Sequence, residues 1–572
     1  MIKARQSVQD VAAYPLIATT RKDKIRLDLN ESLWGCSPTV MEALNRIDDL
    51  EVIAYPDYNG FMKQLSQFLE VPQEQLLISN GADDAIRAVM QTFIDPADQV
   101  LLAYPSFGMI DLHARVVGAD VQQIVYEADL SFPIDKFIAE INDATRLVAV
   151  VRPDSPCGAV ISREQLIRLL EHTPNTLVML DETYTHFLGE SCLDLQAKYD
   201  NLIVLRSFSK AYGLAGLRIG VTAACPAFIE QMRKVNPPFS VNGLAVIAAS
   251  AAMSDKSFLE GVVAELEVER NYVRVGFEKL GLECRGAAAN FHLLQIGDES
   301  DRVHKALIDR GILVKNLNKL PNLGGCFRVA IGMREQNDAL LNALAEVLSP
   351  QAILFDMDGV LVDESRSYRM AIKQTAEHFL GADVSFEQIE SLKRRGGFNN
   401  DWDCTEALLA ERGKPTDRDK IIDVFQKIYR GANFDGLIAG EEWLLSAQLL
   451  ADLASRYSLG VVTGRPREEA EYVLRRHDSA GHIKALIAME DMGEKQKPQP
   501  HGLQLAKQKL GVHRAIYLGD TVDDMKAAKS AGMRAIGVLA PQSQHDKEME
   551  TLLAAEGAAS VLTNVNQLKE VL

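Results

Sequence analysis

The sequence has no closely spaced cysteine pair, no long apolar run and no excess of basic residues. Its seven cysteines are scattered and never form C-x-x-C, which argues against a disulfide framework and a cysteine-bound zinc site. The net charge of −18 argues against nucleic-acid binding. No apolar stretch of about 18 residues or more is long enough to span a membrane, and MIKARQSVQD lacks the apolar segment of a secretory signal. We therefore expect a reduced cytoplasmic protein that has neither nucleic acid nor membrane as a partner.

The chain of 572 residues is too long for one ordinary domain, because single cores stop growing at about 250–300 residues. From Leu76 to Leu205, short apolar runs such as VLLAY, LVAVV and LVML alternate with amphipathic segments. A second series of this kind starts with AILFDMDG at residue 352. This alternation predicts α/β units with largely parallel, helix-covered sheets. Ser349-Pro350 is the best boundary, so we predict domains 1–349 and 350–572.

Four segments of the first domain carry side chains that suit pyridoxal phosphate. They are SNGADD (Gly81, Ala82, Asp83), LDETY (Asp181, Tyr184), SFSKAYGLAGLRIG (Ser207, Ser209, Lys210, Arg218) and FRVAIG (Arg328). A lysine can form a Schiff base, and a carboxylate at a strand end keeps the pyridine nitrogen protonated. Small residues at a helix start offer N–H groups to a phosphate, and an arginine adds a charge-assisted contact. Each residue alone could be an ordinary surface or capping group, but together they predict a cofactor site.

These segments, together with LDLNESLWGCSP, AYPDYNG and YPSFG, resemble the fold-type-I aminotransferases, and within them the histidinol-phosphate aminotransferase group. The resemblance covers nearly all of residues 1–348. It implies that Lys210 is the Schiff-base lysine, that Asp181 pairs with the pyridine nitrogen and that Tyr184 bonds the ring hydroxyl. It assigns the cofactor phosphate to the backbone of Gly81, Ala82 and Asp83 and to Ser207, Ser209 and Arg218.

The same resemblance implies that Phe107 stacks on the cofactor ring and that Arg328 binds an anionic group of the substrate. Tyr55 would reach the phosphate bound in the other subunit, which implies a homodimer. In RPDSPCG, Ser155 stands where the family usually has an asparagine that bonds the ring hydroxyl, and the neighbouring Asp154 would repel a ring oxyanion. Lys315 stands where the group often has a phosphate-binding arginine, and Phe107 replaces a frequent tyrosine.

The second domain places carboxylates at the ends of predicted strands. Asp356 and Asp358 follow AILF, Thr463 ends LGVVT, Lys497 lies in a loop, and Asp520 and Asp524 follow AIYLG. Two carboxylates separated by one residue project from the same side of a strand end. One can attack phosphorus, and the other can handle the proton of the leaving oxygen. Carboxylates that converge from separate strand ends suit magnesium.

These residues resemble the four motifs of haloacid-dehalogenase-type phosphatases, over residues 351 to about 565. The resemblance implies a Rossmann-like core with a helical cap at about 366–445. Asp356 would be the nucleophile, Asp358 the general acid and base, Thr463 a phosphate ligand and Lys497 a neutralising cation. Magnesium would bind Asp356, Asp358, Asp520 and Asp524. Arg394 and Arg395 of KRRGGFNNDWD would recognise substrate, or form a solvated basic turn.

Joined in one chain, the two domains predict a bifunctional enzyme. The first would aminate a phosphorylated ketone such as imidazole-acetol phosphate, with glutamate as the expected donor, and the second would remove the phosphate from the amine. A second interpretation is a threonine-phosphate-type decarboxylase, or an aminotransferase for another phosphorylated keto acid, joined to a phosphatase. A third is a non-catalytic, cofactor-binding dimer scaffold that carries an active phosphatase.

Overall fold

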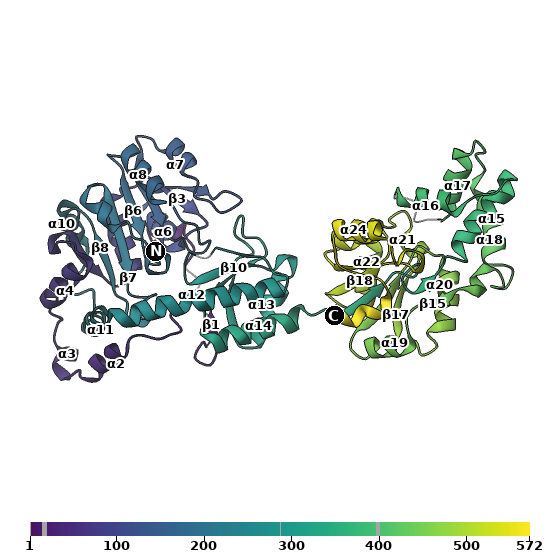
Figure 1. The fold of residues 1–572 in the computed structure, drawn as a ribbon. Helices are drawn as coiled ribbons and strands as arrows, with labels where there is room; N and C mark the ends of the chain where they lie inside the picture. Colours follow the sequence, from purple (N-terminus) through teal and green to yellow (C-terminus); the bar gives the residue numbers. More distant parts are fainter. Residues whose placement is uncertain (1, 14–19, 287, 396–400) are drawn as a thin grey trace. The chain divides into compact units, whose positions relative to one another are not determined.

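The computed structural model describes residues 2–13, 20–286, 288–395 and 401–572, apart from the side chain of Arg394. The chain divides into two compact units, Met1–Val347 and Leu348–Leu572, each built on a β-sheet with α-helices packed on it (Figure 1). The predicted α/β class is confirmed. None of the helices in the described part of the chain has both the length and the apolar character needed to cross a membrane.

The first unit contains a seven-stranded sheet. Its strands, in spatial order, are β2 (Leu76–Ser79), β8 (Gly220–Ala223), β7 (Leu202–Ser207), β6 (Leu177–Asp181), β5 (Thr145–Val151), β3 (Gln99–Tyr104) and β4 (Asp120–Val125). Only β8 runs antiparallel to its neighbours, so the other six strands point the same way. The sequence predicted a largely parallel sheet, but it gave no strand for β8.

Helices cover both faces of this sheet because its strands are apolar on both sides. In β6, Val178 and Leu180 belong to one buried cluster, whereas Leu177 and Met179 belong to another. Such alternation is what successive strand residues pointing to opposite faces require. One face packs on α5 (Ala82–Phe93), α6 (Gly108–Val117) and α10 (Pro226–Val235). The other packs on α2 (Pro38–Asn45), α4 (Asn59–Leu69), α7 (Ile134–Glu140), α8 (Arg163–His172) and α11 (Gly243–Ser254).

A second, smaller sheet completes the first unit. Its order is β1 (Ile25–Leu27), β11 (Ile312–Asn316), β12 (Cys326–Ala330), β10 (Phe291–Gln295) and β9 (Cys284–Arg285). The helices α12 (Lys256–Lys279) and α13 (Ser300–Asp309) contact this sheet, and α14 (Arg334–Leu348) follows its strand β12. The parallel pairing of β1 with β11 joins the beginning of the unit to its end. This sheet positions Lys315 and Arg328.

The second unit contains a six-stranded sheet in which all neighbours are parallel. The order is β17 (Ile483–Ile487), β16 (Ser458–Val462), β13 (Ala352–Phe355), β18 (Ala515–Gly519), β19 (Arg534–Val538) and β20 (Ala558–Leu562). One face packs on α22 (His501–Leu510), α23 (Val522–Ser530) and α24 (Lys547–Ala555). The other packs on α19 (Ala447–Ala454) and α20 (Arg467–His477).

A helical insert follows β13 in the second unit, as the resemblance implied. It contains α15 (Tyr368–Leu380), α16 (Phe386–Arg394), α17 (Asp401–Glu411) and α18 (Arg418–Tyr429). The chain enters the insert through β14 (Val362–Asp363) and leaves it through β15 (Glu442–Trp443), and these two short strands pair in antiparallel fashion. The residues next to this pair, Glu364 and Glu441, therefore lie where the insert joins the sheet domain.

Candidate active sites

The predicted site around Lys210 lies at the ends of three strands of the first unit. Asp181 is the last residue of β6, and Ser207 is the last residue of the parallel neighbour β7, three residues before Lys210. β2 points the same way as β7, and its last residue, Ser79, leads into Gly81. Because parallel strands end at the same edge of a sheet, residues far apart in the sequence meet there.

Lys210 and Tyr184 lie together at this edge. The Nζ atom of Lys210 donates to the backbone carbonyl of Leu29 at 2.8 Å and lies 5.8 Å from the centre of the Tyr184 ring. Burial alone would raise the pKa of Tyr184, but the charges of Lys210 and Arg328 outweigh it and hold this pKa below its ordinary value. Asn30 Nδ2 also donates to the Tyr184 hydroxyl, at 3.0 Å. The sequence interpretation assigned no role to Asn30, although LDLNESLWGCSP contains it.

The carboxylate of Asp181 is deeply buried at the same strand end. It is 3% exposed and accepts a hydrogen bond from the Thr183 backbone N–H at 2.8 Å. Burial raises its pKa to about 6, although the bonds from Thr183 oppose this effect. A nearby positive charge would favour the ionised carboxylate again. Asp181 therefore fits the protonated nitrogen of a pyridine ring.

The start of α5 and the side chain of Arg218 form an anion cradle. Gly81 is the N-cap residue, and no side chain among the described residues caps the first N–H groups, of Ala82 and Asp83 among others. Gly81 has a φ of +83°, which favours glycine, and a Cβ atom there would lie 2.5 Å from Arg218 Nη2, so the guanidinium would have to move. Arg218 Nη2 donates to Asp83 Oδ2 at 2.8 Å, and Nη1 reaches Ser209 Oγ at 3.4 Å. A phosphate fits these donors.

The remaining residues predicted to bind the cofactor differ in how deeply they are buried. Ser207 and Ser209 are buried, and the N–H of Ser209 donates to the Ser207 hydroxyl at 3.1 Å. Phe107 is half-buried at the N-cap of α6. Tyr55 is 80% exposed and stacks on Phe239, with ring centres 4.4 Å apart. Tyr55 thus lies on the surface of the chain.

Arg328 joins the second sheet to the edge of the first. Its Nη1 donates to Ser155 Oγ at 2.8 Å, and its Nη2 donates to the carbonyl of Asp28 at 2.5 Å. The register of β11 and β12 sets the exposed Lys315 directly opposite Arg328. The serine that departs from the family pattern therefore contacts the predicted substrate arginine, and Lys315 adds a second cation beside it.

The carboxylate of Asp154, the neighbour of Ser155, is bound by Ser106 and Cys157. It accepts hydrogen bonds from the hydroxyl of Ser106 and, at 3.2 Å, from the thiol of Cys157. Its complete burial raises its pKa to about 7, even though these bonds favour ionisation. These two partners fix the position of the carboxylate, and repulsion of a ring oxyanion by Asp154 stays a prediction.

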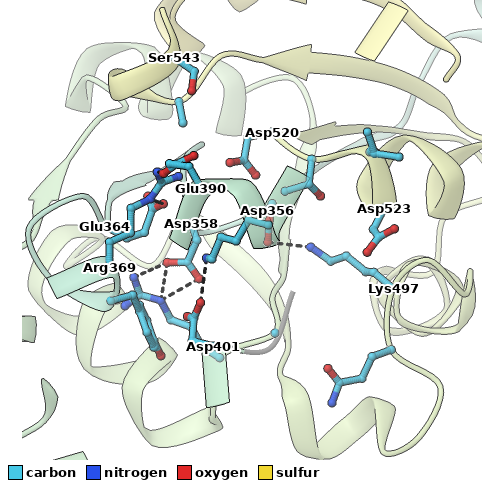
Figure 2. Close-up of a pocket in the computed structure, with 18 of the residues that line it drawn as sticks. Asp356, Asp358, Glu364, Arg369, Glu390, Asp401, Lys497, Asp520, Asp523 and Ser543 are labelled. Atoms are coloured by element: carbon cyan, nitrogen blue, oxygen red, sulfur yellow. Dashed lines mark hydrogen bonds and ion pairs between the residues drawn. The ribbon is translucent and has the colours of Figure 1, made fainter. Parts of the chain in front are cut away.

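The second unit has its pocket at the carboxyl ends of β13, β16 and β18. The pocket has a volume of about 350 Å³ and is lined both by the sheet domain and by the helical insert (Figure 2). Asp356 and Asp358 follow β13, and Asp520 follows β18. Thr463 directly follows β16, is fully buried and accepts a hydrogen bond from the Arg465 N–H at 3.1 Å.

Three of the predicted metal ligands form one group. Each of Asp356, Asp520 and Asp524 offers a carboxylate oxygen that lies within 4.8 Å of the other two. Burial raises the pKa of Asp356 to about 7, and burial plus the two neighbouring carboxylates raise the pKa of Asp520 well above its usual range. Such a cluster of oxygen ligands, in need of positive charge, fits a magnesium ion.

Lys497 supplies part of this positive charge. Its Nζ atom lies 2.8 Å from Asp356 Oδ1 (Figure 2) and 2.8 Å from Asp524 Oδ1. Burial opposes ionisation of Asp524, but Lys497 and the hydroxyls of Thr521 and Tyr517 keep the pKa of Asp524 below its ordinary value. The lysine therefore bridges the predicted nucleophile and a predicted metal ligand.

The carboxylate of Asp358 does not belong to the metal-ligand group. Arg465 Nε donates to Asp358 Oδ1 at 2.8 Å and to Oδ2 at 3.1 Å. The buried guanidinium also donates from Nη1 to Glu441 Oε2 at 2.8 Å and to the Tyr429 hydroxyl at 2.9 Å. The sequence interpretation quoted Thr-Gly-Arg but assigned no role to Arg465. This arginine links the predicted acid and base to α18 and the end of the insert.

Of the two arginines predicted to recognise substrate, the structure describes the side chain of Arg395 but not that of Arg394. Arg395 lines the pocket and pairs with Glu411 at 2.8 Å. The side chain of Arg394 and residues 396–400 of KRRGGFNNDWD lie outside the described part of the chain. Nearby, Lys393 also lines the pocket and pairs with Asp401 at 2.8 Å.

Comparison with known families divides the chain at the same place. Residues 22–344 match the family model described as aminotransferase class I and II, and residues 353–538 match that of haloacid dehalogenase-like hydrolases. Two relatives are histidinol-phosphate aminotransferases. The protein of Moorella thermoacetica is 33% identical over 61% of this chain and 93% of its own length, and that of Clostridium novyi is 31% identical over 59% and 96%.

Solved structures show the same fold for the first unit. The histidinol-phosphate aminotransferase of Sinorhizobium meliloti, in complex with pyridoxal-5'-phosphate, has a TM-score of 0.57 and 23% identity. This match covers 61% of this chain and 98% of that chain. The L-threonine-O-3-phosphate decarboxylase of Porphyromonas gingivalis has a TM-score of 0.51 and 22% identity, over 56% and 98%. At these identities the structural likeness concerns the fold alone.

Proposed function

Because this chain belongs to the class I and II aminotransferase family and carries a C-terminal haloacid dehalogenase-like hydrolase domain, we propose that it catalyses two successive reactions. The first domain aminates a phosphorylated ketone, and the second hydrolyses the phosphate ester of the resulting amine. Imidazole-acetol phosphate, histidinol phosphate and histidinol fit this order, and the relatives named histidinol-phosphate aminotransferases support it. The observation that carries the proposal is the presence of two separate anion sites in one chain, around Lys210 and around Asp356.

The residues around Lys210 fit pyridoxal phosphate. Asp181 would pair with its pyridine nitrogen, Tyr184 with its ring hydroxyl, and Arg218 with its phosphate together with the start of α5. When bound, this cofactor supplies an electron sink that stabilises negative charge on the substrate carbon next to the nitrogen. The amine of Lys210 takes the proton from that carbon of the amino donor, and in the second half of the reaction it gives a proton to the former carbonyl carbon of the phosphorylated ketone. Arg328 holds the anionic end of the substrate.

The residues around Asp356 fit hydrolysis of a phosphate monoester. A carboxylate oxygen of Asp356 attacks phosphorus while the bond from phosphorus to the ester oxygen breaks, and Asp358 gives the leaving oxygen its proton. Water then attacks the aspartyl phosphate and gives a proton to Asp358, which releases phosphate and restores Asp356. Lys497 neutralises the nucleophile and the transferred group. Asp356, Asp520 and Asp524 would hold magnesium, which offsets phosphate charge.

We also propose a homodimer formed through the aminotransferase domain. The segment around α3 (Asp49–Ile53) exposes Leu50, Val52 and Ile53 next to Tyr55, which is itself exposed and stacked on Phe239. Large apolar side chains gathered on a surface mark association sites. Placed on the partner subunit, Tyr55 would reach the cofactor phosphate there.

Wild-type protein tests the complete reaction. Supplied with pyridoxal phosphate, magnesium, glutamate and imidazole-acetol phosphate, it is expected to form 2-oxoglutarate, histidinol and inorganic phosphate. Chromatography of the imidazole compounds and a phosphate assay measure the products. Failure to form histidinol phosphate or histidinol would refute the substrate assignment. In a parallel assay with threonine phosphate, release of carbon dioxide would instead identify decarboxylation.

Substitution of Arg465 by lysine tests how Asp358 is held. Lysine keeps the charge but cannot bind both carboxylate oxygens through a planar fork. We expect kcat for phosphate release to fall roughly 10- to 100-fold, within the contribution of a positioned general acid, with little change in KM. Arg467→Lys, on the more exposed start of α20, is the matched control. An unchanged kcat in a folded Arg465→Lys protein would show that this ion pair does not position Asp358 for the reaction.

A further inference from the structure

One wall of the pocket in the second unit is an acidic pair around a single arginine. Arg369 Nε lies 3.1 Å from Glu364 Oε1, and Arg369 also pairs with Glu390. All three side chains line the pocket, and Figure 2 shows them together on one side of Asp358. Two carboxylates share one guanidinium, so the wall keeps one negative charge in excess. Lys393 does not offset it, because Asp401 pairs with this lysine at 2.8 Å.

The second oxygen of Glu364, Oε2, has no hydrogen-bond partner among the residues that the structure describes. Glu364 is 4% exposed, and this oxygen is buried. Buried carboxylate oxygens are nearly always paired, because removing them from water without a partner is unfavourable. An unpaired oxygen in the wall of a substrate pocket indicates a donor that arrives with the substrate.

The position of Glu364 limits what this donor can be. It follows β14, where the insert joins the sheet domain, and it lines the same pocket as Asp356 and Asp520 (Figure 2). A phosphate bound to that cluster would place its ester oxygen near Asp358. A group on the second carbon beyond this oxygen, about three bonds away from it, would then be near Glu364. The excess negative charge favours a cation there.

We propose that Glu364 binds the ammonium group of the substrate, and that the second domain therefore selects phosphate monoesters with a primary amine close to the ester carbon. This inference rests on the proposed function. The ketone that enters the first reaction and the amine that leaves it share their phosphate and differ in this one group. A carboxylate that recognises the ammonium group lets hydrolysis follow amination and spares the ketone.

Glu364→Gln tests this role, because glutamine keeps the shape and removes the charge. Wild-type protein is expected to hydrolyse histidinol phosphate with a kcat/KM about 10- to 100-fold above that for imidazole-acetol phosphate without an amino donor, as one charged hydrogen bond allows. The variant is expected to lose this preference by reduced activity toward the amine, with activity toward the ketone unchanged. Glu364→Asp should restore part of the preference, and Glu387→Gln, on the exposed side of α16, is the control.

Two further measurements separate the outcomes. If Glu364→Gln lowers both activities equally and raises the magnesium concentration needed for half-maximal rate, Glu364 serves the metal site and the inference is wrong. It is equally wrong if the amine preference survives in the variant. Ethyl phosphate and 2-aminoethyl phosphate form a second pair that differs only by the amine. If wild type hydrolyses neither imidazole compound but prefers 2-aminoethyl phosphate through Glu364, the substrate assignment of the proposed function fails while the role of Glu364 stands.

Discussion

Lys210→Ala is expected to abolish transamination and to leave phosphate release from histidinol phosphate intact. The amine of Lys210 lies beside Tyr184 and bonds the carbonyl of Leu29, and alanine offers no group that could take or return a proton there. Loss of a catalytic group of this kind lowers kcat by a factor on the order of 10⁴ to 10⁶. Formation of 2-oxoglutarate from glutamate measures the first reaction, and inorganic phosphate measures the second.

A matched variant makes this result specific. Lys234→Ala removes an exposed lysine at the end of α10, whose Nζ bonds Gln231, and it should leave both activities near wild type. In Lys210→Ala, amino acids should no longer change the visible absorption of the bound cofactor. Transamination at the wild-type rate in Lys210→Ala would contradict the assignment of this lysine. Loss of both activities in a folded protein would contradict the independence of the two sites.

Asp356→Asn is expected to have the opposite effect. An amide oxygen is a poor nucleophile, and the substitution also removes one carboxylate from the group formed with Asp520 and Asp524. Phosphate release should fall by a factor on the order of 10⁴ or more, as for other removed nucleophiles. Amination should continue at its wild-type rate, so that histidinol phosphate accumulates in place of histidinol.

The accumulated product decides the order of the two reactions. Asp419→Asn, in the exposed first turn of α18, is the control and should form histidinol as wild type does. Mixing Asp356→Asn with Lys210→Ala should restore histidinol formation, because the phosphorylated amine can leave one chain and enter another. If Asp356→Asn still releases phosphate at the wild-type rate, Asp356 is not the nucleophile. If it makes no histidinol phosphate, the two domains do not act in series on this substrate.

The departures from the family pattern have a physical explanation only in the folded chain. Ser155 accepts a hydrogen bond from Arg328, so the shorter side chain has become a partner of the predicted substrate arginine. Lys315 stands opposite Arg328 on the neighbouring strand and adds charge at the same place. Asp154 turns to Ser106 and Cys157. A sequence that places Asp154 and Ser155 side by side cannot tell which of them faces the site.

The sequence by itself determined the α/β class, because buried parallel strands are continuous apolar runs. It also predicted the two-domain division and two groups of reactive residues near the ends of such runs. Asp181 ends a strand, Asp356 and Asp520 directly follow one, and Lys210 comes three residues after one. Only the tertiary structure decided the antiparallel β8, the second sheet of the first unit and the contacts of Arg465 and Glu364. β8 pairs with the distant strand β2, β1 pairs with β11, and Arg465 bonds Asp358, which lies 107 positions away. One oxygen of Glu364 has no hydrogen-bond partner among the described residues. A local pattern carries no information about either kind of feature. The charge left over on Glu364 exists only because folding buries it beside one shared arginine.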